Sequence, residues 1–197
     1  MTKHSIPLGK ILGIQIGLDY SWFVIFALIT WMLADSYYPD EFKDWSPLLY
    51  WLTGAATAIM LFVSVLLHEL GHSVVALRYK IPVRSITLFL FGGVAQIGAE
   101  PPSAVAEFFI AIAGPLVSLA LAVLFYAAQP LVAGAEPLLG LAKYLAYINL
   151  ALVLFNLIPG YPLDGGRVFR AIVWAITGDT LLSAGAAALA SEINSDR

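Results

Sequence analysis

Long apolar runs are the feature that most limits what this chain can fold into. In 197 residues the sequence has four of them, at about 19–34, 47–79, 103–128 and 138–157. About 20 apolar residues of helix cross a bilayer core, and a soluble fold of this size cannot cover so much apolar surface. Because 60% of the residues are hydrophobic and 12% are charged, we predict an all-α polytopic membrane protein with about four transmembrane helices.

The segments between and beyond these runs are expected to add short elements to one membrane-embedded domain, 1–197. The alternating stretch Ile11–Leu18 favours a strand near the membrane surface, with an amphipathic lead-in as an equal alternative. Residues 81–99 favour a hairpin or re-entrant loop sheltered by helices, or one paired with the N-terminal strand. Its Gly92-Gly93 pair is interpreted as a turn, or as part of a strand that pairs with an extended substrate. Residues 171–190 predict a short helical tail.

The charged residues indicate orientation and exclude several classes of function. The net charge is −3 and no basic stripe is present, so no nucleic-acid binding is expected. The absence of cysteine excludes disulfides and thiolate metal sites. The positive-inside rule places the N-terminus and the end of the second run in the cytoplasm. It rests on basic residues that precede the first run or follow the second and fourth: Lys3, Lys10, Arg78, Lys80, Arg84, Arg167 and Arg170.

His68, Glu69 and His72 form the pattern H-E-x-x-H inside the second apolar run. On a helix, residues i and i+4 face the same direction, so both imidazoles can bind one Zn²⁺. Glu69 then lies beside the first ligand, where it can act as a general base toward a water molecule. The alternative is a pair of core histidines bonded to backbone carbonyls. Since ionisable side chains inside membrane segments are costly and functional by default, we predict one zinc ion per chain.

The third zinc ligand is expected to be a carboxylate. A catalytic zinc usually has three protein ligands, and the chain has no cysteine and only His4 outside the motif. Most of its 13 acidic residues lie in loops or near the termini. Glu107 lies one turn inside the third run, where it is expected to face water or a helix N-terminus. Asp164 follows the fourth run in a segment whose prolines and glycines force an irregular backbone. We favour Asp164 as the ligand over its alternative role as a turn cap.

Two further features near these residues have open interpretations. Asn156 is either a polar partner for the substrate carbonyl or tetrahedral intermediate, or it hydrogen-bonds to the broken backbone near Pro159. The Gly114-Pro115 pair is interpreted as helix packing and a kink rather than chemistry.

Other functions are consistent with the same motif. The spans carry few polar residues for a metal transporter, and the intact Glu69 disfavours an inactive scaffold that binds transmembrane helices. A gluzincin-type protease would need a glutamate as its third ligand, and after the third run only Glu136, in the loop on the opposite side, and Glu192 are available.

Several motifs together resemble the site-2 protease family, peptidase family M50, over about residues 6–180. They are H-E-L-G-H at 68–72, the following Gly-Gly pair, A-G-P-L-V-S at 113–118 and F-N-L-I-P-G-Y-P-L-D-G-G at 155–166. The resemblance implies an intramembrane zinc metalloprotease that hydrolyses transmembrane segments of membrane protein substrates, as in regulated intramembrane proteolysis. It also implies roles for five residues: zinc binding by His68, His72 and Asp164, general base catalysis by Glu69, and the family's second-motif asparagine at Asn156.

The resemblance also concerns the chain's surroundings and extent. It implies a lipid bilayer and a transmembrane protein substrate as partners, and strands near Ile11 and Ile86 that guide the substrate or gate the site. With the topology, it predicts a multi-pass protein of the plasma membrane whose active site faces the cytoplasm. The branch that the chain most resembles usually continues with further spans and often with CBS domains. Because the sequence stops at Arg197, no CBS domain is expected here.

Overall fold

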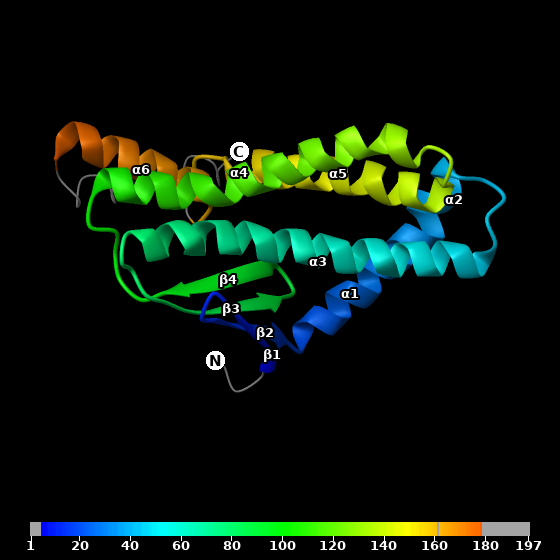
Figure 1. Cartoon of the computed structure of the whole chain (residues 1–197), viewed down its shortest axis with the longest axis horizontal. Coiled ribbons are helices and arrows are strands. Elements are labelled where there is room, and N and C mark those ends of the chain that lie inside the picture. Colours follow the sequence, from blue (N-terminus) through cyan, green and yellow to red (C-terminus); the bar gives the residue numbers. More distant parts are fainter. Residues whose placement is uncertain (1–4, 161, 179–197) are drawn as a thin grey trace.

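The computed structural model describes residues 5–160 and 162–178, which form a helical bundle with one small sheet (Figure 1). In chain order the elements are β1 Ser5–Ile11, β2 Ile14–Asp19, α1 Ser21–Met32, the π-helix η1 Leu33–Tyr37, α2 Tyr38–Glu41, α3 Pro47–Arg78, β3 Val83–Phe89, β4 Gly92–Ile97, α4 Ala104–Ala128, the 3₁₀-helix η2 Gln129–Val132, α5 Glu136–Asn156 and α6 Asp164–Thr177.

Four helical segments among the described residues are long and apolar enough to cross a membrane: Ser21–Glu41, Pro47–Arg78, Ala104–Val132 and Glu136–Asn156. They correspond to the four predicted spans, so the mostly helical fold with four candidate spans is confirmed. Within the bundle, α4 packs against α3, α5 and α6. In Figure 1 the helices α3, α4 and α5 lie side by side, and α1 crosses α3 at an angle.

The first span continues beyond its predicted end at residue 34. The chain remains helical through η1 and α2 to Glu41, although residues 35–41 lie beyond the apolar run and include Asp35, Asp40 and Glu41. Tyr38 explains the difference, because its ring is fully buried and its hydroxyl lies 2.6 Å from the Thr57 hydroxyl on α3. Its ring also packs against Tyr37 and Trp45. Aromatic packing against the bundle therefore keeps a polar stretch helical.

The sheet combines two hairpins that are far apart in the sequence, in the order β1-β2-β3-β4. Each hairpin is antiparallel, and β2 pairs in parallel with β3, with Ile16 opposite Ile86. The first hairpin turns at Leu12 and Gly13, whose φ angles of 52° and 83° are those of a type I′ turn. The N-terminal strand and its pairing with the 81–99 segment are thus both confirmed, and the amphipathic lead-in is wrong.

The inner face of the sheet covers the C-terminal half of α3. Ile14, Ile16 and Ile86 are buried in one apolar cluster with Leu70 and Ala76 of that helix. This packing shelters the strands, as the sequence requires of a β segment near membrane depth. It also holds β4 beside the part of α3 that carries the H-E-x-x-H motif.

The chain changes direction between α5 and α6. After α5 ends at Asn156, residues 157–163 run irregularly, and α6 begins at Asp164. The predicted tail helix therefore starts earlier than residue 171, and its part beyond residue 178 lies outside the described residues. The single domain over 1–197 and the absence of CBS domains remain predictions.

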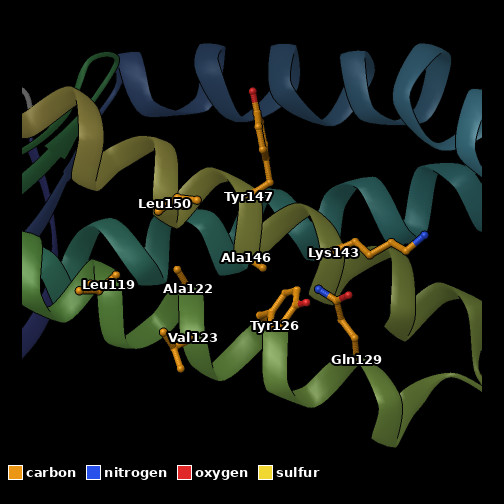
Figure 2. A pocket seen from close by; sticks show the side chains of 9 residues that line it. All are labelled: Leu119, Ala122, Val123, Tyr126, Gln129, Lys143, Ala146, Tyr147 and Leu150. Atoms are coloured by element: carbon orange, nitrogen blue, oxygen red, sulfur yellow. The ribbon is translucent and has the colours of Figure 1, made fainter.

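An apolar groove of 380 Å³ runs between α4 and α5, away from the histidines (Figure 2). It is lined mainly by aliphatic and aromatic side chains, and its one cation, Lys143, is paired at 2.5 Å with Glu41. Inside a bilayer, apolar groups alone can cover such a surface. The groove therefore does not provide the polar groups that catalysis needs.

Candidate metal centre

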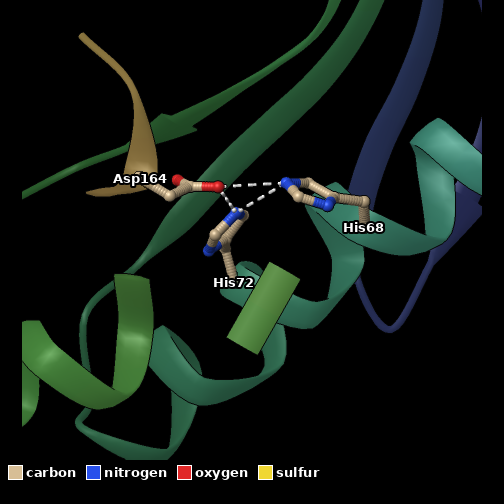
Figure 3. Close-up of side chains that lie close together, drawn as sticks. All are labelled: His68, His72 and Asp164. Atoms are coloured by element: carbon tan, nitrogen blue, oxygen red, sulfur yellow. Dashed lines mark hydrogen bonds and ion pairs between the residues drawn. The ribbon is translucent and has the colours of Figure 1, made fainter. Parts of the chain in front are cut away.

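His68 and His72 lie one turn apart on α3 and meet Asp164, the first residue of α6 (Figure 3). All three residues are buried, with 6%, 4% and 9% of their surfaces exposed. The Asp164 Oδ2 lies 3.1 Å from His68 Nε2 and 3.2 Å from His72 Nε2. The two Nε2 atoms are 3.2 Å apart. The fold thus gathers two imidazoles and a carboxylate from positions 96 residues apart.

The opposite edges of both imidazoles are held by α4. His72 Nδ1–H donates to the Ile110 carbonyl at 2.7 Å, which fixes its tautomer because a carbonyl only accepts. His68 Nδ1 lies 2.9 Å from the Ser118 hydroxyl. Such contacts orient imidazoles that bind metals and leave the Nε2 lone pair available. Both Nε2 atoms accordingly face Asp164 (Figure 3).

The donor set and spacing fit a zinc ion. In a tetrahedral zinc site with bonds of about 2.0–2.1 Å, neighbouring ligand atoms lie about 3.3–3.4 Å apart. The observed separations of 3.1–3.2 Å are close to this value. Within residues 5–160 and 162–178, His68, His72 and Asp164 are the one group of three such side chains found close enough to share an ion.

Gly114 of α4 provides the space beside the two imidazoles. A Cβ atom at this position would lie 2.1 Å from His72 Nε2 and 2.6 Å from His68 Nε2. Any other residue would place its side chain among the metal-facing nitrogens. The interpretation of Gly114 as packing and a kink therefore understated its role.

Asp164 is ionised at neutral pH in this environment. Burial raises the pKa of its carboxyl, but the two imidazoles of His68 and His72, within 3.2 Å of it, outweigh burial and hold the pKa below its ordinary value. An ionised carboxylate is the form that binds a cation. Asp164 is therefore in the state that a metal ligand requires.

Glu69 faces the same cavity from the other side, next to β4. The cavity measures 240 Å³ and is lined by His68, Glu69, His72 and Asp164 together with residues of β4 and the segment before α6. A Cβ atom at Gly93 would lie 2.6 Å from the Glu69 Cγ, so this strand position packs directly on the glutamate. Glu69 is thus close to the triad without belonging to it.

Asn156 lines this cavity too, at the end of α5. Its amide nitrogen donates to the Leu152 carbonyl at 2.9 Å, one turn back in its own helix. The bond that we considered as an alternative, to the broken backbone near Pro159, is therefore replaced by one inside α5. Asn156 keeps its place on the cavity wall.

The other carboxylates considered as ligands lie elsewhere. Glu136 begins α5 at the far end of the bundle and accepts a hydrogen bond from Trp45 Nε1 at 2.7 Å. Glu107 lies in the first turn of α4, so its expected place at a helix N-terminus is confirmed, but it is fully buried and paired with Arg170 rather than facing water. His4 and Glu192 lie outside the described residues.

Sequence reasoning did not foresee the part of α4 in this site. Ser118 and the Ile110 carbonyl, which contact the histidines, and Gly114, which leaves room for an ion, share one face of that helix. Their spacing of four residues is a helical signal, but it carries no chemistry until the histidines are known to lie opposite.

Comparisons with known proteins agree with this geometry. The Mycobacterium tuberculosis protein Rip3 is 44% identical over 194 residues, which cover 97% of this chain and 49% of Rip3. The zinc metalloprotease MJ0392 of Methanocaldococcus jannaschii is 38% identical over 174 residues, 87% of this chain and 46% of that protein. The solved site-2 protease from the same archaeon matches with a TM-score of 0.64 and 35% identity, over 93% of this chain and 78% of that one.

Relatives named zinc metalloproteases and a solved site-2 protease thus match a chain whose structure brings together three side chains that fit a zinc ion. The model of peptidase family M50 matches residues 56–143 and 129–194, and the chain belongs to this family. The chain spans about half the length of the curated relatives that it matches.

Proposed function

We propose that the protein is an intramembrane zinc metalloprotease that hydrolyses peptide bonds in transmembrane segments of membrane proteins. The observation that carries this proposal is the triangle of His68, His72 and Asp164 with Glu69 on the same cavity. The triangle fits a zinc ion, and the glutamate lies beside it rather than in it. A transmembrane substrate is what the resemblance to the site-2 protease family implies for this chain.

His68, His72 and Asp164 would hold the zinc. When bound, zinc supplies Lewis acidity toward a water molecule and toward a peptide carbonyl. Glu69 takes the proton of the attacking water through its carboxylate and later delivers it to the nitrogen of the leaving amine. Because these side chains are largely enclosed by protein, the cavity keeps bulk solvent away from the proton transfers.

Asn156 is assigned to the substrate carbonyl. Its amide lies on the wall of the catalytic cavity, where an N–H can donate to the oxygen that gains negative charge as the carbonyl is attacked. The bond to Leu152 holds the amide in one orientation.

The substrate is proposed to enter as an extended segment along β4. A helical peptide hides its carbonyls in its own hydrogen bonds, so a transmembrane substrate must unwind before it is cut. Within the described sheet, β4 pairs with β3 on one side only, and Gly93 to Ala95 line the cavity. An extended chain can add to this edge by backbone hydrogen bonds.

The proposed orientation puts the catalytic end of the bundle in the cytoplasm of a cell whose plasma membrane holds the protein. Arg78 ends α3, and Lys80 and Arg84 follow it, at the end that carries the sheet and α6. Arg167 and Arg170 lie on α6 itself. Basic residues are concentrated on cytoplasmic segments of membrane proteins.

The test compares the wild-type protein and Glu69→Gln in liposomes that contain a panel of transmembrane peptides with and without helix-breaking residues. Mass spectrometry of the products and elemental analysis of the protein are the readouts. We expect both proteins to hold about one zinc, and cleavage by the variant to fall by at least about 10²-fold. Zinc-loaded wild-type protein that cuts none of these peptides, or a variant that cuts them equally well, would contradict the proposal.

A further inference from the structure

Glu107 is a fully buried acidic residue that the proposed mechanism does not use. It lies in the first turn of α4, and its Oε1 accepts hydrogen bonds from two nitrogens of Arg170, one of them, Nε, at 2.8 Å. Arg167 Nε is 4.0 Å from the same oxygen. Both arginines belong to α6, so one carboxylate joins the start of α4 to α6.

The position of α6 determines where the Asp164 carboxylate lies. Asp164 is the first residue of α6, and the irregular chain 157–163 connects it to α5. Arg170 follows on the same helix less than two turns later. Since α6 is one rigid element, holding Arg170 against α4 also holds the Asp164 end of the helix.

One face of α4 contacts both histidines of the candidate metal centre and also α6. Glu107, Ile110, Gly114 and Ser118 are separated by three or four residues, which places them on a single stripe of the helix. All four are buried. Ile110 and Ser118 contact the two imidazoles, Gly114 leaves the space beside them, and Glu107 holds α6.

A simpler account of Glu107 explains only part of this. An acidic residue in the first turn is favoured by the helix dipole, but that effect requires neither burial nor a guanidinium partner. Burial of a carboxylate is tolerated when an arginine pairs with it through more than one donor. The contact with Arg170 is therefore the feature that a role for Glu107 has to explain.

We propose that Glu107 is a positioning residue for the third metal ligand. Through Arg170 it docks α6 on α4 and thereby brings the Asp164 carboxylate to the two histidine nitrogens. This inference rests on the proposed metal site, but it does not depend on proteolysis. It concerns the affinity for the metal and the geometry of its ligands.

The experiment measures zinc affinity by competition with a chelator, and the absorption spectrum of the Co²⁺-loaded protein, on the full chain in detergent. Glu107→Gln keeps the size of the side chain and removes its charge. We expect its zinc affinity to fall by about 10–100-fold, as for other residues that orient metal ligands. Its Co²⁺ spectrum should shift toward that of Asp164→Ala, because both variants lose the aspartate from the coordination sphere.

The matched control is Asp40→Asn, which removes one carboxylate charge from an exposed position in α2, at the other end of the bundle. It should bind metal like the wild type. Arg170→Met should reduce the zinc affinity more than Arg170→Lys. The double variant Glu107→Gln, Arg170→Met should bind zinc no more weakly than the weaker of its two single variants. Such non-additivity identifies two residues that act through one contact. If Glu107→Gln fails to fold, the Arg170 series tests the same contact.

Two of the three outcomes separate this inference from the proposed function. Wild-type affinity and an unchanged Co²⁺ spectrum in Glu107→Gln would overturn the positioning role, even if the variant melts at a lower temperature, and would leave the protease proposal intact. A wild-type protein that binds metal and does not cleave peptides would remove the proposed function, while a weakened Glu107→Gln would still support this inference. A wild-type protein that takes up no metal would overturn both.

Discussion

Gly114 lies against the metal-facing nitrogens of both histidines, with no side chain of its own to fill the gap. A Cβ atom there would approach these nitrogens to 2.1 and 2.6 Å, far below a van der Waals contact. His72 cannot retreat easily, because its Nδ1–H is bonded to the backbone of the same helix at Ile110. At the scale of the residue, the absence of a side chain at Gly114 therefore determines whether an ion can enter the site.

Gly114→Ala is expected to abolish stoichiometric zinc binding. The added methyl group occupies the space beside the two Nε2 atoms. To avoid this clash, one of the imidazoles has to break its hydrogen bond to α4. Gly134→Ala is the matched control, because a Cβ atom there meets nothing within 4 Å. Elemental analysis of both purified variants after exposure to zinc is the measurement. A fully loaded Gly114→Ala protein would show that the ion lies elsewhere.

The turn between α5 and α6 is the element that delivers Asp164. Gly165, the second residue of α6, packs on the end of α5, and a Cβ atom there would lie 2.4 Å from the carbonyl oxygens of Leu157 and Ile158. Backbone atoms cannot swing away as a flexible side chain can. The close approach of the two helix ends thus depends on a glycine next to the proposed ligand.

Gly165→Ala is expected to displace the start of α6 and to lower zinc affinity by about tenfold or more, the range found when support for a metal ligand is lost. Gly160→Ala, in the same turn, should bind zinc normally because a Cβ atom there meets nothing within 4 Å. Chelator competition on the two variants gives the comparison. Equal affinities would mean that the turn adjusts without moving Asp164.

The whole molecule has two chemically different ends (Figure 1). The end with the sheet and α6 carries the metal centre and most of the described basic residues. The opposite end carries the aromatic cluster around Tyr38, the Lys143–Glu41 pair and the start of α5. This asymmetry supports the proposed orientation, since basic segments tend to remain in the cytoplasm.

The orientation is testable because the chain contains no cysteine. Single-cysteine variants Lys43→Cys and Glu100→Cys place one thiol at each end, at exposed positions. In intact cells, a maleimide reagent that cannot cross membranes should label the first variant, and should label the second only after permeabilisation. The reverse pattern would place the metal centre on the external side.

The sequence by itself determined the features that depend on local periodicity and composition. Four apolar runs predicted four spans, because a bilayer imposes a minimum length on any helix that crosses it. The spacing of His68 and His72 placed two imidazoles on one face of a helix for the same short-range reason. The alternating N-terminal stretch left a strand and an amphipathic lead-in as equal alternatives, and the structure has a strand there.

Contacts between distant segments were decided only by the tertiary structure. The parallel pairing of β2 with β3 and the helical continuation to Glu41 depend on what packs against them. Asp164 was reached in the sequence by excluding other carboxylates, whereas its approach to His68 depends on how α6 docks on α4. The roles of Gly114 and Glu107 arise from surfaces that local sequence does not specify, because a side chain's partners across the bundle are set by helix packing rather than by its neighbours in the chain.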